Sequence, residues 1–307
     1  MSVEEQIALF IASMIRLAMP LMLASTGELV SERAGVLNLS LEGMMLLGAF
    51  FASYGTYVTG SPVMGILIGV LLVLPVALLQ AFLSVTLRAN QLVVGIGFNL
   101  IALGVTTLSY REIFGPLSRV SLPGFDPVHV PWLSDIPFIG TALFSQNILM
   151  YVGLVIIVAI WFTLTRTSIG LAIRAMGENP RSADQAGLSV FKYRYGAVLF
   201  TGAMAGLAGG FLSVGDIHTF TENMTNGAGY LALAAVIFGN WSVWKTVGAC
   251  LLFGAATSLQ FQLPGWGIDV PTAWLLMLPY ILALVAVAGL VGRVEQPVAL
   301  SIPYRRN

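Results

Sequence analysis

Charged residues, cysteine and histidine are all scarce in this 307-residue chain. Only 9% of the residues are charged, against roughly 25% in a typical soluble protein, while 57% are hydrophobic. This composition predicts a membrane protein. The single cysteine, Cys250, has no partner for an internal disulfide, and His129 and His218 have no Cys or His at metal-binding spacing. We therefore expect no bound metal and no other cofactor.

Enzyme signatures are missing as well. The sequence has no G-x-S-x-G nucleophile motif, and neither Lys192 nor Lys245 occupies the lysine position of a Walker A phosphate-binding loop. The net charge is zero and no basic tract occurs, so nucleic acid is not an expected partner. We expect a membrane protein without a catalytic site. If ATP drives it, another chain must hydrolyse that ATP.

Apolar segments of membrane-spanning length alternate with polar connections along the chain. A spanning helix needs about 20 apolar residues. The pattern predicts an all-α polytopic membrane protein with about nine transmembrane helices, in a range of eight to ten. They are expected at 7–30, 64–87, 91–110, 147–165, 195–214, 230–239, 247–261 and 271–291, with one more formed by a short apolar run that follows segment 31–43 and ends at Tyr57. Segment 230–239 is too short to cross alone. The first span follows Glu4 and Glu5 with no small-residue cleavage site, so we expect it to be retained.

The distribution of lysine and arginine predicts the orientation. Segment 166–194 carries five of the fourteen basic residues, and so basic a short loop is expected on the cytoplasmic side. Alternation of nine spans then puts the N-terminus outside and the C-terminus inside. The other basic residues expected inside are Arg33, Arg88, Lys245, Arg293, Arg305 and Arg306. Arg111 and Arg119 fall in the long outer connection, where the charge rule is weak.

Segment 166–194 also carries the signals of a short helix. Asn179 can cap its first turn, Pro180 suits the first helical position, and Gly187 can close the helix in the left-handed conformation. These signals predict a helix of roughly two turns over 180–186. Its polar side chains would be those of Arg181, Asp184 and Gln185. A helix this short is marginal alone in water, which favours a docking element; the alternative is a solvated loop that only sets the orientation.

Polar residues inside the predicted spans are candidates for a substrate pathway, because polar groups in a membrane need partners. Asn38 and Glu42 are four residues apart on one face of a helix start, where a role in the pathway and a role in packing are equally open. Asn99 lies near the middle of the fourth span. For Arg16 and Glu28, a buried ion pair, or side chains that extend to the ends of the span, is a better interpretation than a role in the pathway. The candidate pathway residues are Asn38, Glu42, Asn99, Asn223 and Asn226.

The two halves of the chain show a weak likeness. Apolar segments that begin at Asn38 and at Asn223 each follow a long span and a polar break, and they enter the membrane from opposite sides. This predicts a four-plus-four inverted repeat within a single domain, 1–307. Its parts would be a first helical repeat (1–110), an outer loop and central span (111–165), a cytoplasmic coupling loop (166–194) and a second helical repeat (195–307). The alternative is a chance likeness between glycine-rich apolar segments.

Two sequence blocks resemble the integral-membrane permease subunits of bacterial ABC importers for branched-chain amino acids, ribose and nucleosides. They are SERAGVLNLSLEGMMLLGAF (31–50) and GLAIRAMGENPRSADQAGLSV (170–190). Span order and loop placement extend the resemblance over nearly the whole chain. The ERAGVxNLxLEG form looks most like the permeases of nucleoside importers, because ribose-type members carry an aspartate-containing version instead.

The resemblance implies the ABC importer permease fold, a transport role and a place in the bacterial plasma (inner) membrane. It implies that 180–187 is the coupling segment that sits in a cleft of the ATPase subunit. The residues assigned to coupling are Arg174, Gly177, Glu178, Asn179, Pro180, Arg181, Asp184, Ala186 and Gly187. The implied partners are an ABC ATPase, a second and usually paralogous permease chain, and an extracytoplasmic substrate-binding protein, beside membrane lipid.

A nucleoside is the substrate that this resemblance favours. The alternatives are a permease for simple sugars or branched-chain amino acids, an ion-coupled secondary transporter that uses Glu42, and a membrane scaffold with no pathway.

Overall fold

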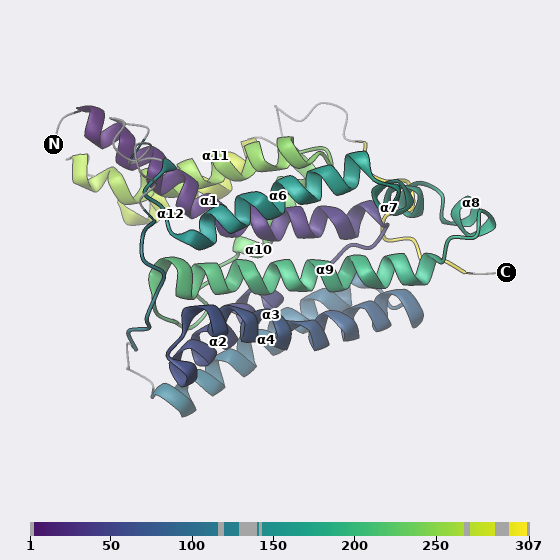
Figure 1. The fold of residues 1–307 in the computed structure, drawn as a ribbon, viewed down its shortest axis with the longest axis horizontal. Coiled ribbons are helices and arrows are strands. Elements are labelled where there is room, and N and C mark those ends of the chain that lie inside the picture. Colours follow the sequence, from purple (N-terminus) through teal and green to yellow (C-terminus); the bar gives the residue numbers. More distant parts are fainter. Residues whose placement is uncertain are drawn as a thin grey trace.

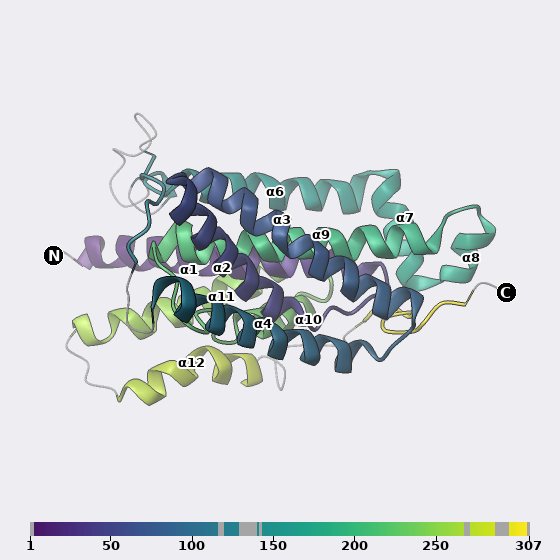
Figure 2. The same ribbon diagram turned by 90° about the horizontal axis from the view of Figure 1, so that it is seen from below.

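The structure, a computed structural model, describes residues 3–115, 120–128, 140, 143–266, 271–285 and 295–305. Arg119, His129, Arg293, Arg306 and the last part of the ninth predicted span, 286–291, lie outside these ranges. Within them, helices make up nearly all of the regular structure, and the β-structure is one isolated bridge between Pro127 and Asn147 (Figures 1 and 2). The prediction of an all-α protein is confirmed.

The first half of the chain forms four long helices. They are α1 (Val3–Arg33), α2 (Leu41–Thr59), α3 (Pro62–Ala81) with a π-helical continuation η1 (Phe82–Thr86), and α4 (Gln91–Phe114). Side-chain caps fix two of the starts. The Ser61 hydroxyl accepts a hydrogen bond from the Met64 amide at 3.5 Å, and Asn90 Oδ1 accepts one from the Leu92 amide at 3.0 Å. These helix bounds agree with the predicted spans to within a turn or so.

The second half contains both long and short helices. They are α6 (Ile148–Arg166), α7 (Ser168–Glu178), α8 (Pro180–Gln185), α9 (Val190–Gly210) continued by the π-helical η2 (Phe211–Ile217), α10 (Ala228–Phe238), α11 (Val243–Gln262), the 3-10 turn η3 (Pro264–Trp266) and α12 (Thr272–Val285). Segment 166–194 therefore holds two helices and the start of a third. Of the two complete helices, the sequence predicted only α8. The third is α9, which was predicted as the span 195–214 and which η2 continues to Ile217.

Five of the described helices are long and apolar enough to cross a membrane. They are Glu5–Arg33, Pro62–Thr86, Gln91–Phe114, Ile148–Arg166 and Val190–Ile217, and the shorter apolar helices include Ala228–Phe238 and Ala273–Leu282. The protein is therefore a multi-pass membrane protein. With 11 residues, α10 is about 16 Å long, so it cannot cross the membrane by itself, as the sequence predicted.

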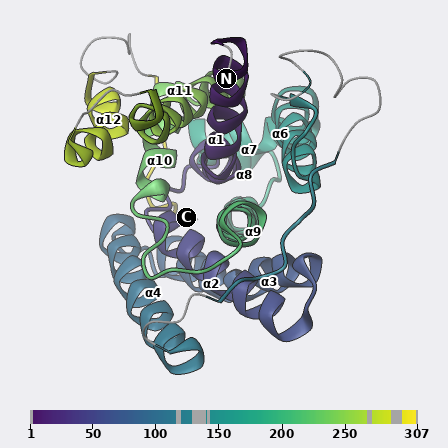
Figure 3. The ribbon, with the colours of Figure 1, turned by 90° about the vertical axis from the view of Figure 1, so that its left-hand side faces the viewer.

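Helices α1 and α9 pack together at the centre of the molecule. Seen along the helices in Figure 3, α9 lies between α1 and the pair formed by α2 and α3. Helix α3 packs against α9, and α11 packs against α1. The buried face of α9 is made mostly of small residues, including Ala205, Gly206, Ala208 and Gly209, which allow close contact between helices. This packing builds the core on which the shorter helices rest.

The two ends of the molecule differ in character. The N-terminus lies at one end, whereas α7, α8 and the last described residues lie at the other (Figures 1 and 2). Segment 295–305 returns to the helices of that second end. The Ala299 amide donates to the Gly177 carbonyl at 2.7 Å, and Arg194 Nη1 donates to the Ile302 carbonyl at 3.0 Å. The C-terminal segment is thus part of the structure around α7 and α8.

Candidate functional site

Helix α2 begins inside the bundle and not at its end. After α1 ends at Arg33, the chain turns back along the last turns of α1. The Val36 amide donates to the Ser31 carbonyl at 3.0 Å, and the Asn38 amide donates to Glu28 Oε1 at 2.8 Å. Helix α2 therefore starts beside the part of α1 that lies more than one turn before Arg33, and the residues at its start are fully buried.

The expectation that Asn38 and Glu42 share one helix face is wrong, because α2 starts at Leu41. Asn38 Oδ1 accepts hydrogen bonds from the Ser40 amide at 3.2 Å and from the Ser40 hydroxyl. These local bonds hold a turn that competes with helix formation. Asn38 is fully buried beneath the start of α2.

Glu42 joins the first turn of α2 to the first turn of α10. Its Oε1 accepts hydrogen bonds from Thr225 Oγ1 at 2.7 Å and from the Gly227 amide at 2.8 Å, and its Oε2 accepts one from the Gly229 amide at 2.6 Å. The carboxylate thus satisfies amides at the N-terminus of α10, where a negative charge is favoured. Gly229 permits the contact, since a Cβ there would lie 2.5 Å from the Glu42 backbone.

The opposite end of α10 is held by the last turn of α1. Arg33 donates from Nε and Nη2 to the carbonyl of Trp241 at 3.0 and 2.7 Å, and the Trp241 indole donates to Glu32 Oε2 at 2.5 Å. A cation next to a helix C-terminus is favourable, as is the Glu42 carboxylate at the N-terminus. Helix α10 is therefore fixed at both ends by charged side chains from the first half of the chain.

Asn99 connects α4 to the same junction. Its Oδ1 accepts the Gly43 amide at 2.8 Å, and its Nδ2 donates to the Leu39 carbonyl at 2.9 Å and to Tyr230 Oη at 2.8 Å. Asn99 is the ninth of the 24 residues of α4, so these contacts lie near the middle of that helix. The structure therefore places Glu42 and Asn99 around one junction of α2, α4 and α10.

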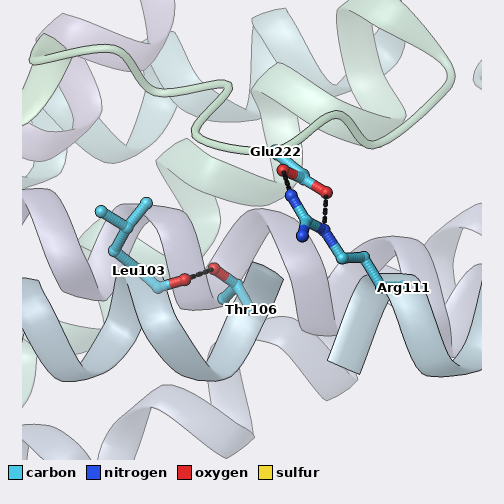
Figure 4. A network of polar contacts seen from close by, with 4 residues as sticks. All are labelled: Leu103, Thr106, Arg111 and Glu222. Carbon is cyan, nitrogen blue, oxygen red and sulfur yellow. Dashed lines mark hydrogen bonds and ion pairs between the residues drawn. The ribbon is translucent and has the colours of Figure 1, made fainter. Parts of the chain in front are cut away.

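Asn223 and Asn226 lie in the turn that leads into α10. Both side chains are exposed, and the Asn226 amide donates to the Asn223 carbonyl at 3.0 Å. Just before α10, Arg111 at the end of α4 holds Glu222 by two hydrogen bonds of 2.7 and 2.9 Å (Figure 4). This pairing holds the pKa of the Glu222 carboxyl below its ordinary value. The turn is thus tied to α4 as well as to Glu42.

A cleft of about 590 Å³ lies beside this turn, and its lining includes Ser13 and Leu17 from the N-terminal half of α1. It lies between α1, η2, α10, α11 and α12. Arg16 Nε pairs with Asp216 Oδ1 at 3.1 Å on its wall, so the partner of Arg16 is Asp216 and not Glu28. Tyr280 and Asn226 line the cleft as well, and Tyr280 Oη donates to the Asn226 carbonyl at 2.7 Å.

The candidate coupling residues lie at the opposite end. Asn179 Oδ1 accepts the Ser182 amide at 3.1 Å, Pro180 is the first residue of α8, and Gly187 has φ +86°. The predicted short helix is confirmed, and it ends at Gln185. Arg181, Ser182 and Gln185 of α8 are exposed, whereas Ala183 is buried and Asp184 accepts a hydrogen bond from Tyr304 at 2.9 Å.

Helices α7 and α8 together form an exposed surface. A groove of about 740 Å³ runs between them and is lined by Ala172, Ala175, Glu178, Asn179, Ala186 and Leu188, among others. Gly177 lies in the tight packing of α7 against α1, and Arg174 donates to the Gly170 carbonyl at 3.4 Å. Arg181 projects from the exposed side of α8. All nine candidate coupling residues therefore belong to one end of the fold.

Sequence reasoning missed several residues of the junction. Thr225, Gly229, Tyr230, Trp241 and Tyr280 were not among the candidates. The signal that was available was Tyr230, which follows Gly229 at the start of a short apolar segment. The partners of the missed residues come from the first half of the chain or from α12, so no local pattern could identify the contacts.

Comparison with known proteins gives relatives that match over most of their length. The chain is 34% identical to the guanosine ABC transporter permease protein NupQ of Bacillus subtilis, over 99% of this chain and 98% of the relative. It is 34% identical to the nucleoside ABC transporter permease protein NupC of Lactococcus lactis, over the full length of both. It is also 38% identical to the putative glucose ABC transporter permease protein TsgC13 of Haloferax volcanii, over 81% of this chain and 75% of the relative.

No solved structure matches the chain. The family model described as the permease component of branched-chain amino acid transport systems matches residues 10–287. The match begins within α1 and extends past α12, so it takes in both helix starts at the junction and the surface formed by α7 and α8. The chain belongs to this family of transport-system permeases.

Proposed function

We propose that the chain is the membrane subunit of an ATP-driven importer that takes up nucleosides. The observation that carries this proposal is the 34% identity, over essentially full length, to two permeases named for guanosine and nucleoside transport. A simple sugar is the second candidate, because the relative named as a putative glucose permease is 38% identical over a shorter range. ATP is hydrolysed on a separate ATPase chain.

The surface of α7 and α8 docks on that ATPase. Half of the six residues of α8 are exposed, while its caps and Asp184 fix its position, which suits an element that transmits motion. The proposed coupling residues are Arg174, Gly177, Glu178, Asn179, Pro180, Arg181, Asp184, Ala186 and Gly187. Closure of the ATPase pushes α8 and thereby shifts the permease between outward and inward access.

The junction of α2, α4 and α10 borders the substrate pathway. Two features support this: both α2 and α10 begin within the bundle, and the cleft is lined by Thr225, Asn226 and Ala228 at the start of α10. Asn99, Asn223 and Asn226 are the residues nearest to the solute. Asn38 and Glu42 are buried beneath them and position the two helix starts. The N-terminus of a helix carries a partial positive charge, so helices that begin inside the membrane can bind electron-rich groups of a solute.

The two halves of the chain form an inverted repeat. Reciprocal packing supports this proposal: α3 of the first half contacts α9 of the second, and α11 of the second contacts α1 of the first. In this arrangement α1 to α4 correspond to α9 to α12. The short α10 then corresponds to α2, and both helix starts belong to matching positions of the two repeats.

An ion-coupled transporter is less well supported. That alternative needs Glu42 to exchange a proton or a cation during transport. Both oxygens of the carboxylate already accept hydrogen bonds, three in total, from Thr225, Gly227 and Gly229. A carboxylate that is fully engaged at the N-terminus of α10 fits a structural role.

The complete importer has further partners. These are a second permease chain, which is paralogous to this one, and an extracytoplasmic substrate-binding protein. The protein resides in the bacterial plasma membrane with its N-terminus outside and its C-terminus in the cytoplasm. The placement of the N-terminus and of α8 at opposite ends of the molecule supports this orientation.

Uptake by intact cells tests the substrate. In a strain that lacks this gene, uptake of labelled guanosine and uridine should be lost and should return when the gene is restored. Uptake of glucose and leucine should not change, because the proposed pathway serves nucleosides. If glucose uptake depends on the gene and guanosine uptake does not, the sugar alternative replaces the proposal.

Labelling of single cysteines tests the orientation. Buried Cys250 is first removed by Cys250→Ala, and Ser121→Cys and Ser182→Cys are then made separately. Ser121 is preferred to Gly124, where a Cβ would lie 2.1 Å from the His218 ring. A membrane-impermeant thiol reagent should label position 121 in intact cells and position 182 only after the membrane is opened. Labelling of position 182 alone in intact cells would reverse the orientation and remove the docking proposal.

A further inference from the structure

Two tyrosines stand next to each other at the junction and belong to different helices. Tyr230 is in the first turn of α10, and Tyr280 is in α12. Atoms of both side chains lie within 4 Å of the point where a Cβ on Gly227 would stand: Tyr280 Oη at 3.1 Å and Tyr230 Cδ2 at 3.9 Å. The two rings therefore flank the turn that leads into α10.

The hydroxyl groups of both tyrosines are held in place by the protein. Tyr230 Oη accepts a hydrogen bond from Asn99 Nδ2 at 2.8 Å, and Tyr280 Oη donates one to the Asn226 carbonyl at 2.7 Å. Each ring is thereby anchored at its polar edge. Much of each ring is nonetheless uncovered, since Tyr230 is 45% and Tyr280 is 41% exposed. The two aromatic faces are thus both preorganised and accessible.

The surroundings of the pair do not suit lipid. The Asn99 amide lies near the middle of α4 and is bonded to the Tyr230 hydroxyl, so contact with hydrocarbon there would be costly. Tyr280 and Asn226 line the cleft between α1, η2, α10, α11 and α12. In Figure 3, α4, α10 and α12 lie along the same side of the molecule. Tyr280 therefore borders this cleft directly, and Tyr230 lies close to it at the Gly227 turn.

We propose that Tyr230 and Tyr280 form a stacking site for the base of the transported nucleoside. Aromatic side chains bind nucleobases through their faces and tolerate different bases, because every base has a planar π-surface. The polar groups beside the two rings can form hydrogen bonds with the edge of the base. The site gives the pathway a contact for a planar heteroaromatic group, which a simple sugar or an aliphatic amino acid lacks. This inference rests on the proposed nucleoside function.

The test uses the complete importer, reconstituted with its ATPase, its partner permease and its binding protein, and measures uptake of labelled guanosine and uridine. Tyr230→Leu and Tyr280→Leu should each lower guanosine uptake about tenfold, the effect of losing one stacking contact. Tyr230→Phe and Tyr280→Phe keep the ring and should retain most of the uptake. Uridine uptake should fall less than guanosine uptake, because a pyrimidine offers a smaller face.

Tyr57→Leu is the matched control. Tyr57 is also a tyrosine on an exposed helix face, 54% exposed, but it packs against Phe114 with ring centroids 5.0 Å apart and lies away from the junction. Its substitution should leave uptake of both nucleosides unchanged. Assembly of each variant with the ATPase is measured by co-purification, and stimulation of ATP hydrolysis by loaded binding protein is measured in parallel.

The outcomes separate the inference from the proposed function. Leucine variants that assemble and transport guanosine like the wild type would overturn the stacking site, as would equal losses for guanosine and uridine. Leucine variants that fail to assemble would show that the tyrosines contact the partner permease, which also overturns it. If the wild-type importer takes up glucose and no nucleoside, the proposed function itself fails.

Discussion

Gly187→Val should abolish most of the substrate-stimulated ATP hydrolysis and most of the uptake, each by more than about tenfold. Gly187 has φ +86° and its amide closes α8 by donating to the Asp184 carbonyl at 2.9 Å. A β-branched residue is strongly disfavoured in this left-handed conformation. Because α8 has only six residues, the loss of its C-terminal turn should disorder the whole docking surface.

Two further variants make this result interpretable. Gly60→Val is the matched control: Gly60 has φ +69°, nothing lies within 4 Å of its Cβ position, and it ends α2 at the other end of the molecule. It should lower stability without uncoupling ATP hydrolysis from uptake. Asn179→Ala removes the cap at the start of α8, should cost about 1 kcal/mol of helix stability, and should give a milder defect than Gly187→Val.

Purified complex in lipid, assayed with and without loaded binding protein, gives the comparison. Binding of the loaded binding protein should persist in all three variants, since none of the three residues lines the cleft beside Asn226. Wild-type stimulation and uptake by Gly187→Val would mean that α8 is a solvated loop, and the coupling assignment would have to be withdrawn.

Glu42→Gln should cause the second large effect, a loss of folded complex together with a loss of uptake. Glutamine has one carbonyl oxygen in place of two carboxylate oxygens, and its amide group is a donor that would face other donors. At least one of the Gly227 and Gly229 amides then loses its partner, which costs about 1–3 kcal/mol in a buried site. The favourable charge at the N-terminus of α10, worth about 0.3–1 kcal/mol or more, is lost too.

Glu222→Gln serves as the control for removal of a carboxylate. Glu222 also bonds to a partner in another segment, Arg111, but this ion pair is exposed and such pairs contribute little. Thermal unfolding in detergent and uptake in cells should therefore change little for Glu222→Gln. A Glu42→Gln protein that unfolds at the wild-type temperature would contradict the structural role of Glu42. Altered uptake by such a stable variant would point instead to direct contact with the solute.

Local sequence signals predicted α8 well. Asn179 caps the start of the helix, Pro180 is its first residue, and Gly187 follows its end. These roles involve only neighbouring residues, so the spacing in the sequence is enough to predict both ends of α8. Helix α10 was predicted to be too short to cross the membrane for a similar reason, because the length of its apolar run can be read directly. The amphipathic α7 escaped prediction, since it has buried and exposed apolar residues but no membrane-length run.

Contacts between distant segments could not be predicted in the same way. The partner of Arg16 is Asp216, which comes 200 residues later (216 − 16) and belongs to a stretch expected to be an outer loop. Glu42 and Gly229 meet only because α2 and α10 both begin inside the bundle. The start of α2 itself was misplaced, since the Asn38 side chain bonds to Ser40 and holds a turn where a helix was expected. Polar residues in apolar segments predicted where a site would be, but the residues that they contact could be identified only from the fold.

The return of segment 295–305 to α7 and α8 gives the protein an order in which its parts are completed during synthesis. Helix α8 leaves the ribosome more than a hundred residues before Tyr304, so the bond from Tyr304 to Asp184 can form only after α9 to α12 have been made. Until then, α8 depends on its two caps and on neighbouring helices. Asn179 and Gly187 therefore matter most to the nascent chain, and a growing polypeptide does not have the finished α7–α8 surface until its last helices are in place.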